Sequence, residues 1–132
     1  MEQHFLFLSS RDSKESHPEN KPSSFIVELS RPLNLEGLWV CGLKEIHFTS
    51  MISAKGHLEV CSNICEESIV GSTLKPVLRR IPLNRQKQHF TFQDTYYFKV
   101  SRPQIQRVEI SIRGSPFESG DAWCVLHLVR QH

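Results

Sequence analysis

The stretch Val-Glu-Ile-Ser-Ile-Arg at residues 108–113 alternates apolar and polar side chains without interruption. Successive side chains of a β-strand point to opposite faces, so Val108, Ile110 and Ile112 are expected on a buried face and the residues between them on a solvated one. Short alternating or β-rich runs of this kind hold most apolar residues of the chain, and no segment keeps a helical period. The sequence therefore predicts an all-β fold.

Outward from this stretch, polar and turn-forming residues separate eight or nine such runs. Some connections are much longer than hairpin turns, which favours a Greek-key arrangement over a simple meander. We predict a single jelly-roll β-sandwich of about eight antiparallel strands, with residues 1–132 forming one domain. The expected strands cover residues 4–8, 24–30, 38–48, 57–64, 73–83, 88–93, 96–100, 105–113 and 122–131.

Three local features refine this map. Pro76 and Pro82 interrupt the run at 73–83, and because proline cannot donate to a ladder, a bent or edge strand is expected there. Gly42 lies inside the longest run, where its missing side chain permits a bulge or a close approach of another backbone. Residues 11–24 are polar and without periodicity, which predicts a long surface loop.

Composition excludes several classes of protein. Sixteen Lys and Arg residues against fourteen Asp and Glu give a formal net charge of +2, far from the balance of a protein that coats nucleic acid. No apolar run approaches the roughly 20 residues of a membrane span, so a soluble protein is expected. The cysteines are too few and scattered for a disulfide scaffold, which indicates free thiols in a reducing compartment. They are Cys41, Cys61, Cys65 and Cys124.

The sequence contains no complete motif for a metal site, a catalytic site or a phosphate-binding loop. His57 precedes Cys61 and Cys65, but structural zinc sites need a second ligand pair, so we predict no metal. The chain has no His-x-His pair of the cupin type, no Gly-x-Ser-x-Gly elbow and no phosphate-binding glycine loop. We therefore expect neither an enzyme nor a cofactor or small-molecule substrate. Trp39 and Trp123 lie inside expected strands and are predicted to be core residues.

One cluster of basic residues lies between positions 75 and 87. It is a candidate for contact with packaged DNA, for contact with an acidic neighbouring subunit, or for a nuclear import signal. The alternative is a solvated edge strand whose charges prevent aggregation, which suits two arginines between two prolines. The candidate assembly or charge-contact residues are Lys75, Arg79, Arg80, Arg85 and Lys87.

Three segments, in order along the chain, resemble one known family. Residues 35–46 read LEGLWVCGLKEI, and residues 70–79 read VGSTLKPVLR. The third segment combines Ile-Ser-Ile-Arg at 110–113, Phe-x-x-Gly at 117–120 and Leu-His-Leu-Val-Arg at 126–130. The three are similar to segments of the minor capsid, or penton, proteins of Polinton (Maverick) elements and adintoviruses. The opening at residues 5–10 departs from the family by lacking a proline.

The resemblance implies a single jelly roll that forms a homopentamer at the fivefold vertices of an icosahedral capsid. Its partner there would be a double jelly-roll major capsid protein. It further implies location in the virion and assembly in the nucleus of a host cell. The alternative from the residues alone is a non-viral β-sandwich binding module, lectin-like or cytokine-like.

Overall fold

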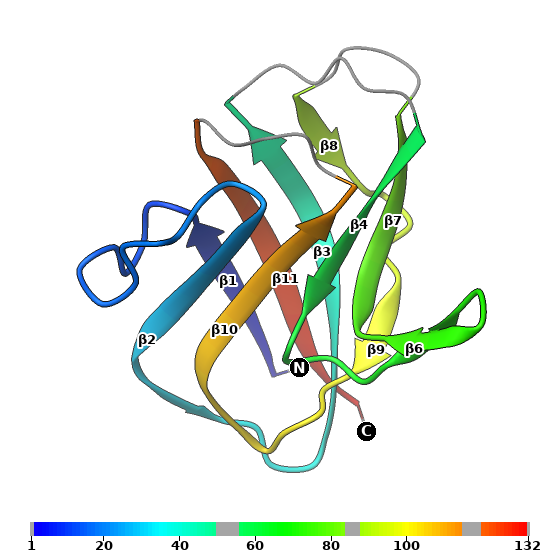
Figure 1. Ribbon diagram of the computed structural model, residues 1–132. Helices are drawn as coiled ribbons and strands as arrows, with labels where there is room; N and C mark the ends of the chain where they lie inside the picture. The colour runs from blue at the N-terminus through cyan, green and yellow to red at the C-terminus, as the bar shows by residue number, and fades with distance from the viewer. Residues whose placement is uncertain (1, 50–55, 84–87, 115–119, 132) are drawn as a thin grey trace.

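Strands and their connections build the described part of the chain. The computed structural model describes residues 2–49, 56–83, 88–114 and 120–131 (Figure 1). No helix within these ranges is long and apolar enough to cross a membrane. The strands are β1 (Gln3–Ser9), β2 (Ser24–Asn34), β3 (Leu38–Phe48), β4 (Gly56–Ser62), β5 (Ser68–Val70), β6 (Thr73–Lys75), β7 (Val77–Leu83), β8 (His89–Thr91), β9 (Tyr97–Lys99), β10 (Gln104–Arg113) and β11 (Ala122–Gln131).

Two antiparallel sheets face each other, and Figure 1 shows one in front of the other. The rear sheet has the order β1-β11-β3-β8, with β9 also on β3, and the front sheet has the order β2-β10-β4-β7. β5 and β6 form a separate hairpin. The pairing is nested along the sequence, because β1 pairs with β11, β2 with β10, β3 with β8 and β9, and β4 with β7. The predicted all-β, antiparallel architecture is confirmed.

The core lies between the two sheets because the strands turn their apolar positions inward. In β10, Val108, Ile110 and Ile112 are buried, whereas Glu109 and Arg113 are exposed. The alternation predicted for this strand is therefore confirmed. The largest fully buried side chains are Phe25, Phe48, Leu35, Leu43, Ile46, Leu58, Ile64, Leu78, Ile105, Ile110 and Leu126.

Gly42 allows the connection between β8 and β9 to cross close to β3. A Cβ atom at this position would lie 2.5 Å from Cγ2 of Thr95 and 2.6 Å from the carbonyl oxygen of Tyr96. The close backbone approach expected here is confirmed. The break in the ladder between β3 and β11 comes after Gly42, where Leu126 pairs with Leu43 but Val125 pairs with Glu45.

The strand expected at residues 24–30 is longer than predicted. β2 continues through Pro32 to Asn34. It is an edge strand, and its ladder with β10 is irregular between Ile105 and Arg107. Proline is tolerated at edges and irregularities because no N–H is required on the open side.

The single bent strand expected at residues 73–83 is wrong. Pro76 separates β6 from β7, and β6 folds back on β5, which was not predicted. The turn between them contains Gly71 with φ +62°, a left-handed conformation that favours glycine. β7, which contains Pro82, is an edge strand as expected.

The two tryptophans occupy different environments. Trp39 is buried and its indole N–H donates to the carbonyl of Glu36 at 3.0 Å, so its predicted core position is confirmed. Trp123 is only partly buried, and its ring stacks on His47 with 5.2 Å between centroids. The prediction for Trp123 is wrong because Ala122 and Cys124 occupy the buried positions on either side of it.

Candidate functional site

Two of the predicted basic residues meet at a buried carboxylate on the front sheet. Glu59 in β4 is only 6% exposed. Its Oε1 lies 3.6 Å from Nζ of Lys75, and its Oε2 lies 3.5 Å from a guanidinium nitrogen of Arg80. Buried carboxylates require such partners, so Lys75 and Arg80 compensate a charge within the same subunit.

The third described basic residue points elsewhere. The guanidinium of Arg79 lies over the rings of Phe92 and Tyr96, 4.4 Å and 3.9 Å from their centroids, and donates to the carbonyl of Asp94 at 2.7 Å. Arg79 thus ties β7 to the connection between β8 and β9. Arg85 and Lys87 lie outside the described residues. The structure brings Lys75 and Arg80 together, but not Arg79 with them.

The four cysteines are buried free thiols. A hydrogen bond to Cys65, together with burial, raises the pKa of Cys41 far above its usual range. Burial alone raises the pKa of Cys124 to about 12, and burial is also the main cause of the raised pKa of Cys61. No group of three or more His, Cys, Asp and Glu side chains in the described ranges is placed to hold a metal ion.

Cys41, Cys61 and Cys124 should therefore be unreactive in the folded protein, whereas the hydrogen bond with Cys41 lowers the pKa of Cys65. Because the thiolate is the nucleophile, we expect iodoacetamide at pH 8 to label Cys124 at least about 100-fold more slowly in buffer than in urea. Mass spectrometry of peptides over time measures both rates. We also expect neither a reductant nor a chelator to change the melting temperature, and rapid stoichiometric labelling or a large drop in melting temperature would contradict this account.

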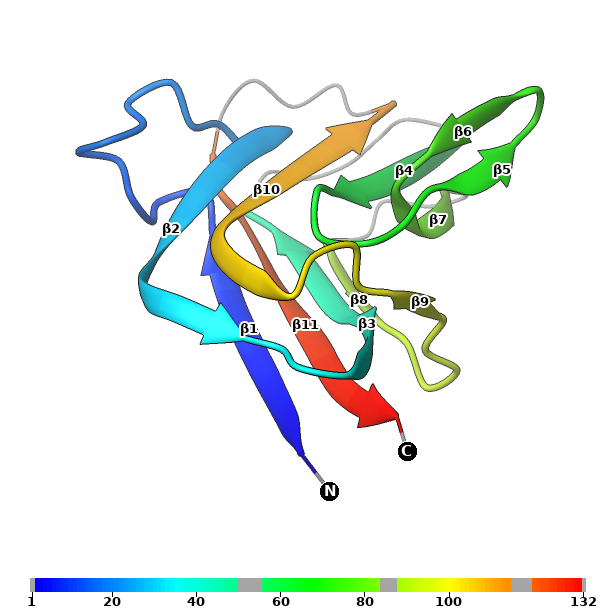
Figure 2. The same cartoon turned by 90° about the horizontal axis from the view of Figure 1, so that it is seen from below.

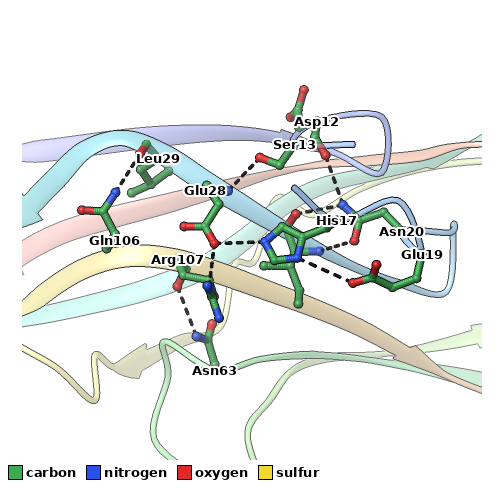
Figure 3. A network of polar contacts seen from close by, with 11 residues as sticks. Asp12, Ser13, His17, Glu19, Asn20, Glu28, Leu29, Asn63, Gln106 and Arg107 are labelled. Carbon is green, nitrogen blue, oxygen red and sulfur yellow. Dashed lines mark hydrogen bonds and ion pairs between the residues drawn. The ribbon is translucent and has the colours of Figure 1, made fainter. Parts of the chain in front are cut away.

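The polar loop between β1 and β2 caps the open edge of β2. Asn20 is 4% exposed, so the predicted surface loop is buried at this residue. Its side-chain oxygen accepts from the N–H of Ile26 at 3.0 Å, and its side-chain nitrogen donates to the carbonyl of Ile26 at 2.9 Å (Figure 3). The hydroxyl of Ser13 accepts from the N–H of Glu28 at 2.9 Å. These side chains bind edge groups that another strand would otherwise pair with.

A charged cluster fastens the same loop to β2 and β10 (Figure 3). His17 Nε2 lies 3.0 Å from Oε1 of Glu28, and Arg107 Nε donates to that oxygen at 2.7 Å. His17 Nδ1 lies 3.6 Å from Glu19. The hydrogen bond from His17 and the charge of Arg107 hold the pKa of Glu28 below its usual value. The edge of β2 is therefore closed by both hydrogen bonds and charge.

The edge of β1, in contrast, is open. The N–H of Ser10 donates to Ala122, and the N–H of Arg130 donates to Glu2, so the even-numbered residues of β1 form the hydrogen bonds to β11. By alternation, the N–H and C=O groups of Phe5 and Phe7 point away from β11, where no described strand pairs with them. No local pattern in the sequence distinguishes the capped edge of β2 from the open edge of β1.

Apolar surface accompanies this open edge. Phe7 is 74% exposed and Phe5 is 46% exposed. The side chain of Phe5 stacks on His127 with 4.4 Å between ring centroids, so Phe7 is the freer of the two. A hollow of about 290 Å³ beside it is lined by Phe7, Leu8, Ser9, Asp12, Trp123 and Cys124.

A second exposed apolar surface lies on the β5–β6 hairpin. Ile69 is 79% exposed, Leu74 is 61% exposed, and the two are directly paired across the hairpin. Figures 1 and 2 show the hairpin projecting from the sandwich. Exposed apolar residues that cluster on a projecting element are typical of interaction sites.

Comparison with known proteins adds no identification. No family model matches the chain, and no curated protein matches it significantly. The functional argument therefore rests on the fold, the exposed surfaces and the sequence segments themselves.

Proposed function

We propose that this chain is a single jelly roll that serves as a structural capsid subunit of the penton type. The nested strand pairing carries the fold proposal. When β8 and β9 are counted as one interrupted strand and the β5–β6 hairpin is set aside, eight strands remain. A jelly roll results when one long antiparallel hairpin of eight strands folds over into two sheets, and nested pairing is what that folding produces.

The sequence supports the capsid role. The segment at 35–46 leads into β3, the segment at 70–79 covers the turn of the hairpin, β6 and the start of β7, and the third runs through β10 and β11. These segments resemble the minor capsid proteins of Polinton elements and adintoviruses. The proposal follows that family: a homopentamer, a double jelly-roll major capsid protein as neighbour, location in the virion and assembly in the host nucleus.

The exposed apolar surfaces also favour assembly over catalysis. A closed ring requires a heterologous interface, in which one patch of each subunit meets a different patch of the next. Among the described residues, the most exposed large apolar side chains are Ile69 and Phe7, followed by Leu74, and they form two separate patches, one at Phe7 and one at the hairpin pair of Ile69 and Leu74. A non-viral binding module would need only one patch, so two separate patches favour the ring.

Mass measurement tests this proposal. We expect light scattering, over a range of concentrations and with or without the major capsid protein, to detect a species of five subunits of 15.3 kDa each. Closure of a ring makes intermediate sizes scarce, so the monomer and the pentamer should dominate. A stable trimer, or a dimer that persists under both conditions, would contradict the proposal.

A further inference from the structure

We propose that the β5–β6 hairpin of one copy binds the open β1 edge of the next copy, an inference that rests on the ring proposed above. Ile69 and Leu74 would pack against Phe7 and the hollow beside it. This contact covers both exposed apolar surfaces at once. The partner that binds the open edge of β1 is thus a second copy of this chain.

The backbone supports this pairing. The outward N–H and C=O groups of Phe5 and Phe7 are available to form hydrogen bonds with a further strand. β5 and β6 pair only with each other among the described strands, so each also has an open side. Adding a strand to a free edge satisfies such groups on both partners, and side chains on alternate residues then provide specificity.

The positions of the two surfaces favour a ring over a symmetric dimer. β1 is the edge strand on one side of the rear sheet. The hairpin connects β4 to β7, which lie on the opposite side of the sandwich. Figure 2 shows β1 and β2 on the left and the hairpin on the right. A symmetric β1–β1 dimer would cover Phe7 but leave Ile69 and Leu74 exposed in both copies. A head-to-tail contact leaves neither surface exposed once the ring closes.

Opposite charges flank the two surfaces. Glu66 and Glu67, both exposed, precede β5, whereas the side chain of Arg11, which follows β1, is 77% exposed. The existing ion pairs of Glu66 with Lys99 and of Arg11 with Asp121 are both 3.8 Å long, and three of the four side chains are exposed while Asp121 is partly buried. Such pairs contribute little to stability, so they can exchange for contacts between copies. Glu66 and Glu67 of one copy and Arg11 of the next therefore carry charges that attract each other when the hairpin lies on the β1 edge.

The test places an aspartate on each surface separately. One variant carries Phe7→Asp, and a second carries Ile69→Asp with Leu74→Asp. Burying an unpaired carboxylate is costly, so each should weaken association at least about tenfold. Leu38→Asp, which also replaces an exposed leucine, is the matched control and should assemble as the wild type does. Circular dichroism and melting temperature verify that each variant folds.

Mixing the two defective variants distinguishes the arrangements. The Phe7 variant retains an intact hairpin and the hairpin variant retains an intact edge, so an equimolar mixture should form one contact and stop at a heterodimer. Sedimentation at high concentration detects it. A symmetric β1 dimer predicts instead that the hairpin variant dimerises alone and that mixing adds nothing, which would overturn the inference.

The remaining outcomes separate this inference from the proposed function. If either aspartate variant still forms pentamers at wild-type concentrations, the hairpin contact is wrong while the penton proposal stands. If the mixture forms heterodimers but the wild type forms open chains in place of closed rings, the contact stands and the pentamer is wrong.

Discussion

Ile110→Ala is expected to lower the free energy of unfolding by about 2–5 kcal/mol, the range for truncating a well-packed aliphatic side chain. Ile110 is among the largest fully buried side chains and lies on β10, which pairs with both β2 and β4. Its removal leaves a cavity in the middle of the front sheet, where neighbouring strands are held by their ladders. Urea unfolding followed by tryptophan fluorescence measures the loss.

The adjacent Glu109→Ala is the matched control. Glu109 belongs to the same strand but its side chain is exposed, so its replacement should change stability by less than about 0.5 kcal/mol. If the Ile110 variant lost less than about 1 kcal/mol, the assignment of the buried face of β10 would be wrong.

Asn20→Ala should have the second largest effect, about 2–4 kcal/mol. It removes the partners of the N–H and C=O of Ile26 and of the carbonyl of Asp12, which the Asn20 side chain binds at 3.0, 2.9 and 3.1 Å. A buried backbone group left without a hydrogen bond costs roughly 1–3 kcal/mol. Thermal unfolding of the variant provides the comparison.

Glu15→Ala, an exposed residue of the same loop, is the control for that variant and should be close to neutral. The edge of β2 loses its cap in the Asn20 variant, so we also expect a greater tendency to aggregate at high concentration. Equal stability of the two variants would mean that the loop is a passive connection between β1 and β2.

Alternation along the chain was sufficient to predict the all-β fold and most strands. It worked at residues 108–113 because β10 buries one face and exposes the other. Alternation is a poor guide to burial in β4, where Glu59 and Cys61 are buried together with Leu58 and Val60, which alternate with them. The basic side chains of Lys75 and Arg80 cover the face that carries Glu59, and their approach depends on tertiary folding that local patterns do not encode.

The hairpin at the proposed interface has a recognisable signal in the sequence. Gly71-Ser72 separates two short β-prone runs, a sequence typical of a two-residue hairpin turn. The role of Asn20 left no such signal, because its partner Ile26 lies on a strand edge whose position depends on the whole sheet. The concentration of basic residues is visible in the sequence. The sequence does not show that Arg80 contacts Glu59 while Arg79 lies over the ring of Tyr96.

Electron microscopy of shells formed by this chain together with a double jelly-roll major capsid protein tests the central claim most directly. The account predicts density for five copies of the sandwich around each fivefold vertex, with neighbouring copies in contact through the hairpin and the β1 edge. Shells whose vertices lack this chain, or that carry it at threefold positions, would contradict the account.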